Sequence, residues 1–176
     1  MTTVESKLRL QPGRVRTTFS VLRETWAFND QRIRLLDELI EFTGLIREVL
    51  PICSVWVGGS WLSDDELPRD IDAVLLIDSE AINRLTDIGE RRLVTTEGLH
   101  EFANTMRLNV DVSVQTWKAL PSVAELSDSD WQILQDRGFW DDWWQRVRSV
   151  PRGARSTRLC SLPRRGYAEV VIDGFK

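Results

Sequence analysis

The chain has 176 residues, of which 42% are apolar and 28% charged, and it contains 8 Trp and 6 Phe. This balance predicts one compact domain over residues 1–176 and excludes a large multidomain enzyme and a fully disordered chain. No run approaches the ~18 to 20 consecutive apolar residues of a membrane span, and the first residues are too polar for a secretory signal, so we expect a cytoplasmic protein that has no membrane partner. Two widely spaced cysteines and one histidine indicate neither a disulfide framework nor a zinc site.

The net charge of −4 is unevenly distributed along the chain. Residues 146–176 contain eight basic and two acidic residues, a net charge of +6, which leaves −10 for residues 1–145. This basic C-terminal segment could contact a polyanion. Alternatively, it neutralises the acidic body of the protein or is simply solvated.

The first part of the chain predicts an irregular arm followed by a long helix. Residues 1–20 form the expected arm, because a Pro-Gly pair within them marks a turn. Asn29 or Asp30 can then cap a helix in which apolar residues recur at spacings of three and four. We expect this helix to continue toward Leu50, where the following proline stops it.

Four segments have the pattern of β-strands. A short apolar run at 54–57 ends in two glycines, and the apolar run at 71–77 predicts a buried strand. Residues 108–114 alternate between apolar and polar side chains, which is typical of a strand with one buried face. The last apolar run, 167–172, predicts an edge strand.

Helical segments separate these strands. Ser79 is expected to cap a helix over about 80–92, and Thr96 could cap another through Met106. Short helices are expected within 122–147. The predicted fold class is therefore α/β (α+β), with a short mixed β-sheet and flanking helices.

Two acids lie at the start of the strand predicted over 71–77. Asp70 and Asp72 are two residues apart, so in an extended chain their carboxylates point to the same side, about 6 to 7 Å apart. Like charges in this setting repel each other and lose hydration, and a divalent cation between them makes the arrangement favourable. Asp111 lies on the polar face of the next strand, and pairing of the two strands would bring the three carboxylates together. We predict that these acids bind Mg²⁺ or Mn²⁺.

A turn of small residues precedes the acids. Gly58, Gly59 and Ser60 follow a short strand, and nine residues separate Ser60 from Asp70. Glycines let the backbone approach an anion closely, and a helix or turn that begins at Ser60 would offer unpaired N–H groups to phosphate. Phosphate at the turn and metal at the strand together suit phosphoryl transfer.

This combination resembles the nucleotidyltransferase superfamily of DNA polymerase β. The resemblance rests on the Gly-Gly-Ser turn at 58–60, the Asp-Ile-Asp sequence at 70–72 and the lone acid Asp111, and it covers about residues 54–114. Within the superfamily, the chain is most similar to small single-domain minimal nucleotidyltransferases, many of which are associated with toxin–antitoxin and phage-defence systems. The resemblance implies a palm-like nucleotidyltransferase fold.

The resemblance also implies a function and a role for each residue. The protein would be a magnesium-dependent enzyme that transfers a nucleoside monophosphate from an NTP to a hydroxyl of a protein or an RNA. Asp70 and Asp72 would be metal ligands and Asp111 a metal ligand or general base, while Gly59 and Ser60 would contact the phosphates. The alternative is a catalytically inactive nucleotidyltransferase fold that binds a protein or a nucleic acid.

The loop after the serine departs from the family pattern and favours that alternative. Many active members have a basic residue here that faces the triphosphate, whereas this loop is acidic and has only Arg69 nearby. Arg69, Arg91, Arg92 or the C-terminal arginines could supply the missing charge. The C-terminal segment resembles the closing segment of the same family, which could bring Arg164 and Arg165 back toward the site.

A tryptophan-rich segment and the histidine have simpler interpretations. Trp140, Trp143 and Trp144 would form one stripe on a helix, which we expect to pack against the body of the protein. The alternative is an exposed patch for a partner protein or a base-stacking surface, which the following arginines would complement. His100 is predicted to be an ordinary surface or half-buried residue.

Overall fold

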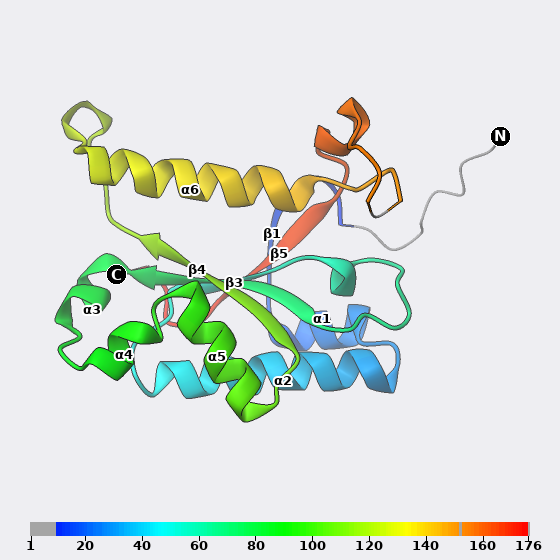
Figure 1. Cartoon of the computed structure of the whole chain (residues 1–176), viewed down its shortest axis with the longest axis horizontal. Helices are drawn as coiled ribbons and strands as arrows, with labels where there is room; N and C mark the ends of the chain where they lie inside the picture. The colour runs from blue at the N-terminus through cyan, green and yellow to red at the C-terminus, as the bar shows by residue number, and fades with distance from the viewer. Residues whose placement is uncertain (1–9, 152, 176) are drawn as a thin grey trace.

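The computed structural model describes residues 10–151 and 153–175, and within them five strands form one mixed sheet in the order β1-β5-β2-β3-β4 (Figure 1). β1 runs parallel to β5 and β3 parallel to β4, whereas β2 is antiparallel to both of its neighbours. The expected mixed sheet is therefore confirmed. The strands are β1 (Gly13–Thr17), β2 (Ser54–Val57), β3 (Ile71–Asp78), β4 (Val110–Trp117) and β5 (Gly166–Val171).

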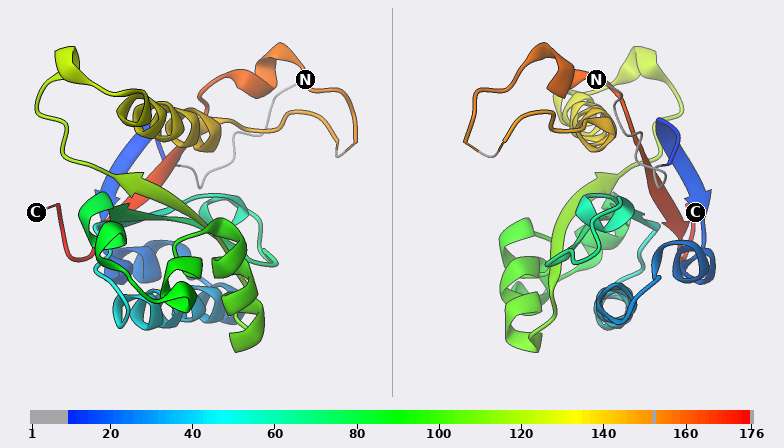
Figure 2. Two further views of the ribbon diagram at one scale, coloured as in Figure 1. Left: turned by 60° about the vertical axis from the view of Figure 1, so that its left-hand side comes forward. Right: turned by 90° about the vertical axis from the view of Figure 1, so that its right-hand side faces the viewer.

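Helices cover both faces of the sheet. Figures 1 and 2 show α1, α2 and α5 on one side and the long helix α6 alone across the other. In the parts of the chain that the structure describes, no helix is long and apolar enough to cross a membrane. The α-helices are α1 (Phe19–Trp26), α2 (Asp30–Arg47), α3 (Ser79–Arg84), α4 (Ile88–Arg92), α5 (Thr96–Met106) and α6 (Asp128–Gln145), and the short 3-10 helices are η1 (Ser60–Leu62), η2 (Val123–Glu125) and η3 (Arg158–Ser161).

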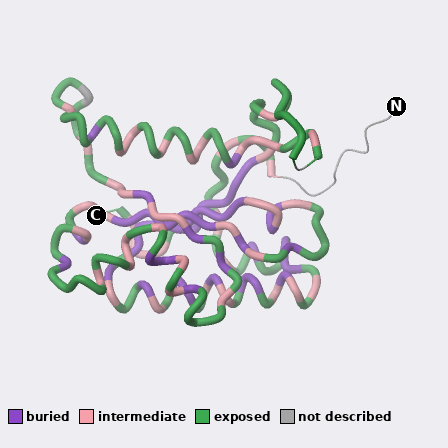
Figure 3. Tube along the Cα trace, in the orientation of Figure 1, coloured by how far each residue is buried: buried purple, intermediate pink, exposed green. Residues whose placement is uncertain are grey.

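The alternation of side chains along each strand divides the buried residues between the two faces. On the face toward α1, α2 and α5, strand residues such as Leu75 and Val112 belong to the larger core. On the opposite face, Trp56 and Tyr167 pack with Trp144 of α6. Figure 3 shows buried chain concentrated along the central strands. The sheet is thus apolar on both faces at its centre.

The prediction for the N-terminal segment 1–20 was wrong where the structure describes it, and residues 1–9 lie outside the described part. Residues 13–17 form an edge strand, and the side chain of Thr18 accepts a hydrogen bond from the N–H of Val21 to begin α1. The strand predicted at 167–172 is not at the edge, because β5 lies between β1 and β2. Pairing between the two ends of the chain stabilises both strands, and local sequence patterns do not report such pairing.

Several helix boundaries differ from the prediction because other residues provide the caps. The helix expected over 80–92 is divided into α3 and α4, with Asp78 and Asp87 as the N-caps. Thr95 rather than the following threonine caps α5. The short helices expected within 122–147 are mainly one 18-residue helix, α6, which begins with a capping box. The long helix expected near residue 30 is confirmed as α2.

The tryptophans of α6 do not form one buried stripe as expected. Trp144 is only 5% exposed and packs on the sheet, whereas Trp143 is 52% exposed. Trp140 is intermediate in exposure and lies against Trp144. A helix that contacts the sheet along one narrow line leaves its other aromatic side chains in solvent.

Candidate active site

The predicted acids lie at the start of two adjacent parallel strands. Asp72 of β3 is directly opposite Asp111 of β4 in the register, and Asp70 immediately precedes β3. Ile71 and Ala73 point into the larger core, so the alternation of the strand places Asp72 on the α6 face. The expected pairing of the two strands is therefore confirmed.

The Gly-Gly-Ser turn packs directly against one of these acids. The N–H of Gly58 donates to the carbonyl of Asp72 at 3.1 Å, and Ser60 begins η1. Gly59 has a φ of 66°, and a Cβ atom there would lie 1.6 Å from Asp72 Oδ2. A Cβ on Gly58 would lie 2.6 Å from the ring of Trp144. Gly58 must therefore lack a side chain because α6 packs against it. Gly59 must lack one because Asp72 lies against it and because its φ is positive.

The charges around Asp72 oppose its ionisation. Burial, together with the nearby carboxylates of Asp70 and Asp111, raises the pKa of Asp72 to about 6. The charge of Arg165 and a hydrogen bond from the backbone of Ser60 act in the opposite direction. The three acids are thus close enough to repel one another, and a bound cation would relieve this repulsion.

Arg165 connects the turn to α6. Its Nη1 donates to the carbonyl of Gly59 at 3.0 Å, and its Nε donates to the carbonyl of Trp144 at the same distance. The expected return of the C-terminal arginines to the site is confirmed for Arg165. Arg164 is exposed, and its backbone N–H donates to the carbonyl of Gln145.

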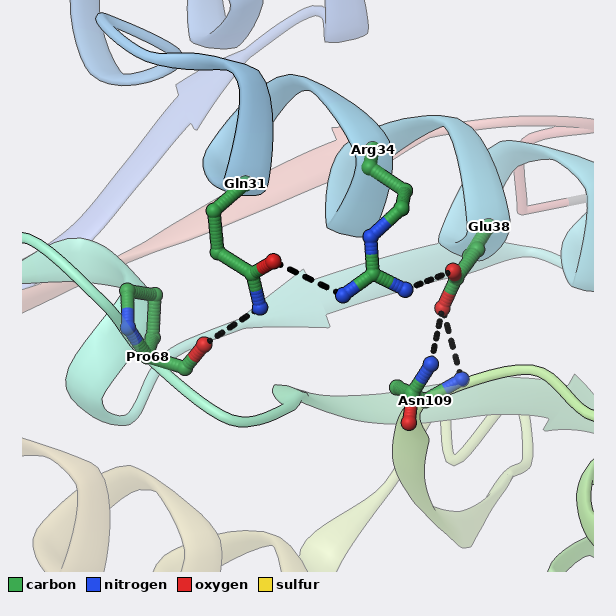
Figure 4. Close-up of polar contacts among 5 residues, drawn as sticks. All are labelled: Gln31, Arg34, Glu38, Pro68 and Asn109. Carbon is green, nitrogen blue, oxygen red and sulfur yellow. Dashed lines mark hydrogen bonds and ion pairs between the residues drawn. The ribbon is translucent and has the colours of Figure 1, made fainter.

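A chain of hydrogen bonds from α2 fixes the approach to both acidic strands (Figure 4). Gln31 donates to the carbonyl of Pro68 at 3.0 Å, and Arg34 bridges Gln31 and Glu38. Glu38 in turn accepts from the backbone and side-chain N–H groups of Asn109 at 2.7 and 3.0 Å. Pro68 and Asn109 each come two residues before an acid of the site, so α2 positions both carboxylate-bearing segments.

A buried arginine holds the loop that follows the serine. Arg32 of α2 is fully buried and donates to the carbonyls of Trp26 and Asp65, both at 2.6 Å, and also to the carbonyl of Trp61. Its guanidinium also lies over the ring of Trp61. The sequence prediction did not include this residue. A signal was present, because Arg32 lies three, four and seven positions before leucines that face the core. An arginine on such a buried helix face needs buried hydrogen-bond partners.

Two adjoining cavities open beside the acids. Their volumes are about 470 and 310 Å³, within the range of small-molecule sites. Arg69 and Asp70 line both cavities, and Arg69 brings a positive charge to their junction. The larger one, called here the acidic groove, is lined by Arg69, Asp70, His100, Asn104, Leu108, Asn109, Val110 and Asp111. The smaller one, called here the serine pocket, is lined by Ser60, Asp65, Leu67, Arg69 and Asp70.

His100 contacts the site, which the sequence did not predict. Its expected surface position is confirmed, but its Nε2 lies 3.0 Å from Oδ1 of Asp111. The packing of α5 against β4 creates this contact. No local pattern in the sequence pairs the two residues, because the contact depends on how the helix crosses the strand.

The residues fit a hard divalent cation by their chemistry but are not gathered around a single point. Carboxylate oxygens are the ligands that Mg²⁺ and Mn²⁺ prefer, and the repulsion at Asp72 is of the kind that such an ion removes. Among the residues that the structure describes, no group of three or more His, Cys, Asp or Glu side chains is arranged so that it could hold a metal ion. Binding of one ion by all three acids would therefore require their side chains to rearrange.

Comparison with known proteins places the chain in one family. A family model described as "Family of unknown function (DUF6932)" matches residues 2–170. This range includes the Gly-Gly-Ser turn and all three acids. No curated protein and no solved structure gives a significant match.

Proposed function

The chain belongs to the DUF6932 family, and we propose that it is a magnesium-dependent nucleotidyltransferase. It would transfer a nucleoside monophosphate from an NTP to a hydroxyl of a protein or an RNA and release pyrophosphate. We further propose that the observed mixed sheet is the sheet of a palm-like nucleotidyltransferase fold. The observation that carries it is Asp72, which lies opposite Asp111 in the register and against the backbone of Gly59.

The three acids would have different roles in the reaction. Asp70, Asp72 and Asp111 would hold Mg²⁺ or Mn²⁺, which when bound would stabilise negative charge on the reacting phosphate. Asp111 is the exposed member of the set and lines the acidic groove, where an acceptor hydroxyl could reach it. It would take the proton of that hydroxyl. His100, in contact with Asp111, would orient the carboxylate for this transfer.

The turn and one arginine would bind the NTP phosphates. The space that a Gly59 side chain would occupy is filled by the carboxylate of Asp72, so the turn would approach the phosphates with the N–H of Gly59 rather than through that gap. Ser60 supplies a hydroxyl at the wall of this pocket. Arg69, which lines both cavities, would balance the charge of the triphosphate.

An inactive nucleotidyltransferase fold that binds a protein or a nucleic acid is the second candidate function. The observation that favours it is Asp65, an acidic residue that lines the serine pocket beside Ser60. A carboxylate at this position repels a triphosphate. Arg32 holds the backbone of Asp65 in place, so the loop cannot move the residue away at low cost.

The resemblance to minimal nucleotidyltransferases suggests a biological setting. We propose a cytoplasmic role in a toxin–antitoxin or phage-defence pair, in which a partner protein is the target or the regulator. A toxin-like reading frame beside the gene would support this setting. Its consistent absence beside the genes of other family members would contradict it.

Transfer of a radioactive label tests the enzymatic proposal. The purified chain is incubated with each α-³²P-labelled NTP, Mg²⁺ and cell lysate, and protein and RNA are scored separately for label. We expect transfer that EDTA abolishes, that Asp72→Asn and Asp111→Asn abolish, and that Asp64→Asn in the exposed loop leaves intact. If no label is transferred and calorimetry detects no binding at millimolar NTP, the inactive fold is the correct interpretation.

A further inference from the structure

A further cavity lies at the C-terminal end of α6. Its volume is about 250 Å³. Arg165 lines it and also donates to the carbonyl of Gly59, so the cavity and the proposed catalytic turn share a side chain. We call it the basic cavity, and its lining includes Trp143, Arg146, Arg148, Ser156, Cys160 and Arg165.

Exposed aromatic rings continue from this cavity along α6. Phe139 and Trp143 are 55% and 52% exposed, and their rings are stacked with centroids 5.9 Å apart and planes at 14°. The neighbouring Trp144 packs on the sheet and anchors the helix. Large flat rings that remain in solvent beside a cavity are the usual platform for unpaired bases.

Arg146 carries a positive charge and has one hydrogen-bond donor without an acceptor. Its guanidinium lies 5.8 Å from the ring centroid of Trp143 and pairs with Asp142 on the preceding turn of the helix. Its Nε is buried and has no hydrogen-bond partner within the described residues. A buried donor without an acceptor is unfavourable, and a guanidinium that turned toward a phosphate oxygen in the cavity would regain one.

The nearby acids already have partners. Asp142 pairs with Arg146, and Asp141 accepts a hydrogen bond from the hydroxyl of Tyr167 at 2.5 Å. Arg148 donates to backbone carbonyls of the following loop, including that of Val150, and this fixes its guanidinium at the cavity wall. Three arginines therefore line the basic cavity beside a stacked aromatic pair, and the charge of one of them, Arg146, is offset by Asp142.

We propose that the basic cavity binds the single-stranded end of a nucleic acid that serves as the acceptor. Bases would stack on Trp143 and Phe139, while Arg146 and Arg148 would bind the phosphates of the same strand. Arg165 would place the end of the strand next to the catalytic turn. That this nucleic acid is the acceptor rests on the proposed function. We choose nucleic acid over protein as the acceptor because a pair of exposed rings with flanking arginines matches the alternating bases and phosphates of a strand.

Fluorescence anisotropy tests the binding without any reaction. The full chain is titrated into fluorescein-labelled 12-nucleotide oligo(U) RNA and oligo(dU) DNA, which differ only in the sugar, so the tighter ligand identifies the acceptor sugar. We expect Trp143→Ala and Arg146→Ala each to weaken binding about tenfold, and Arg146→Lys to recover part of the loss. Binding should also weaken with added salt.

Matched controls come from the same fold. Trp131, at the other end of α6, is 49% exposed, and Arg84 of α3 forms an ion pair with a residue four positions earlier, as Arg146 does. Trp131→Ala and Arg84→Ala should leave the affinity unchanged. Equal losses in the controls, or no binding of either oligonucleotide below about 100 µM, would overturn the inference.

The two proposals fail in different ways. Oligonucleotide binding that depends on Trp143, without transfer of label from any NTP, supports the nucleic-acid site and refutes the enzyme. Transfer of label to protein alone, without oligonucleotide binding, supports the enzyme and refutes the nucleic-acid site.

Discussion

Asparagine at position 72 should stabilise the metal-free protein at neutral and alkaline pH. The pKa of Asp72 rises from 3.8 to about 6 on folding, so at pH values between these two the native state binds more protons than the unfolded state. The free energy of unfolding therefore falls as the pH rises through this window. At 1.36 kcal/mol per unit of pKa, the full effect is about 3 kcal/mol. The amide removes this cost and retains an oxygen that can accept from the N–H of Ser60.

Urea unfolding at pH 4 and pH 8 in EDTA measures this effect. Because the unfolded carboxyl is already partly ionised at pH 4, the wild-type chain should lose about 2.4 kcal/mol between the two pH values relative to Asp72→Asn, which corresponds to roughly 5 to 10 °C in melting temperature for a chain of this size. Asp64→Asn, in the exposed loop, is the control and should change the difference by less than about 0.5 kcal/mol. If wild type and Asp72→Asn show the same dependence on pH, Asp72 is not held in the repulsive environment described above.

Other substitutions test the neighbouring contacts. Gly59→Ala should destabilise the fold by about 3 kcal/mol in urea, because the new methyl group collides with the half-buried carboxylate of Asp72 and the φ is positive. Gly44→Ala in α2, which has open space around it, should instead stabilise the fold by roughly 0.5 to 1 kcal/mol, and equal effects would contradict the geometry. Arg32→Leu should cost about 3 kcal/mol or more, since several buried carbonyls lose their donor, and a neutral result would refute its anchoring role. Contacts with nearby hydroxyl groups lower the pKa of Cys160 to about 6, whereas burial raises that of Cys53 to about 11. Iodoacetamide at pH 7 should therefore alkylate Cys160 long before Cys53, and similar rates would contradict this assignment.

The candidate acids could be predicted from sequence because two local patterns reveal them. Asp72 interrupts an apolar strand, whereas Asp111 belongs to the polar face of an alternating strand. The pairing of the two strands is less evident from the sequence, since α3, α4 and α5 lie between them in the chain. The requirement for Gly59 could be inferred only as conformational freedom. The structure adds a second reason, which is the close approach of the carboxylate.

The contacts that assemble the site could not be predicted in this way. His100 reaches Asp111, and Glu38 reaches Asn109, only after helices pack on the sheet. The position of β5 inside the sheet depends on pairing with β1, more than 140 residues away in the chain. Arg32 gave a weak signal, since a charge on an apolar helix face has more than one possible explanation.

A crystal of the chain grown with Mn²⁺ and a non-hydrolysable NTP analogue tests the central claim most directly. We expect anomalous density for the metal against the carboxylates of Asp72 and Asp111, with the phosphates at the N–H of Gly59 and the hydroxyl of Ser60. Nucleotide or metal bound elsewhere, with these two carboxylates unchanged at saturating concentrations of both, would contradict it.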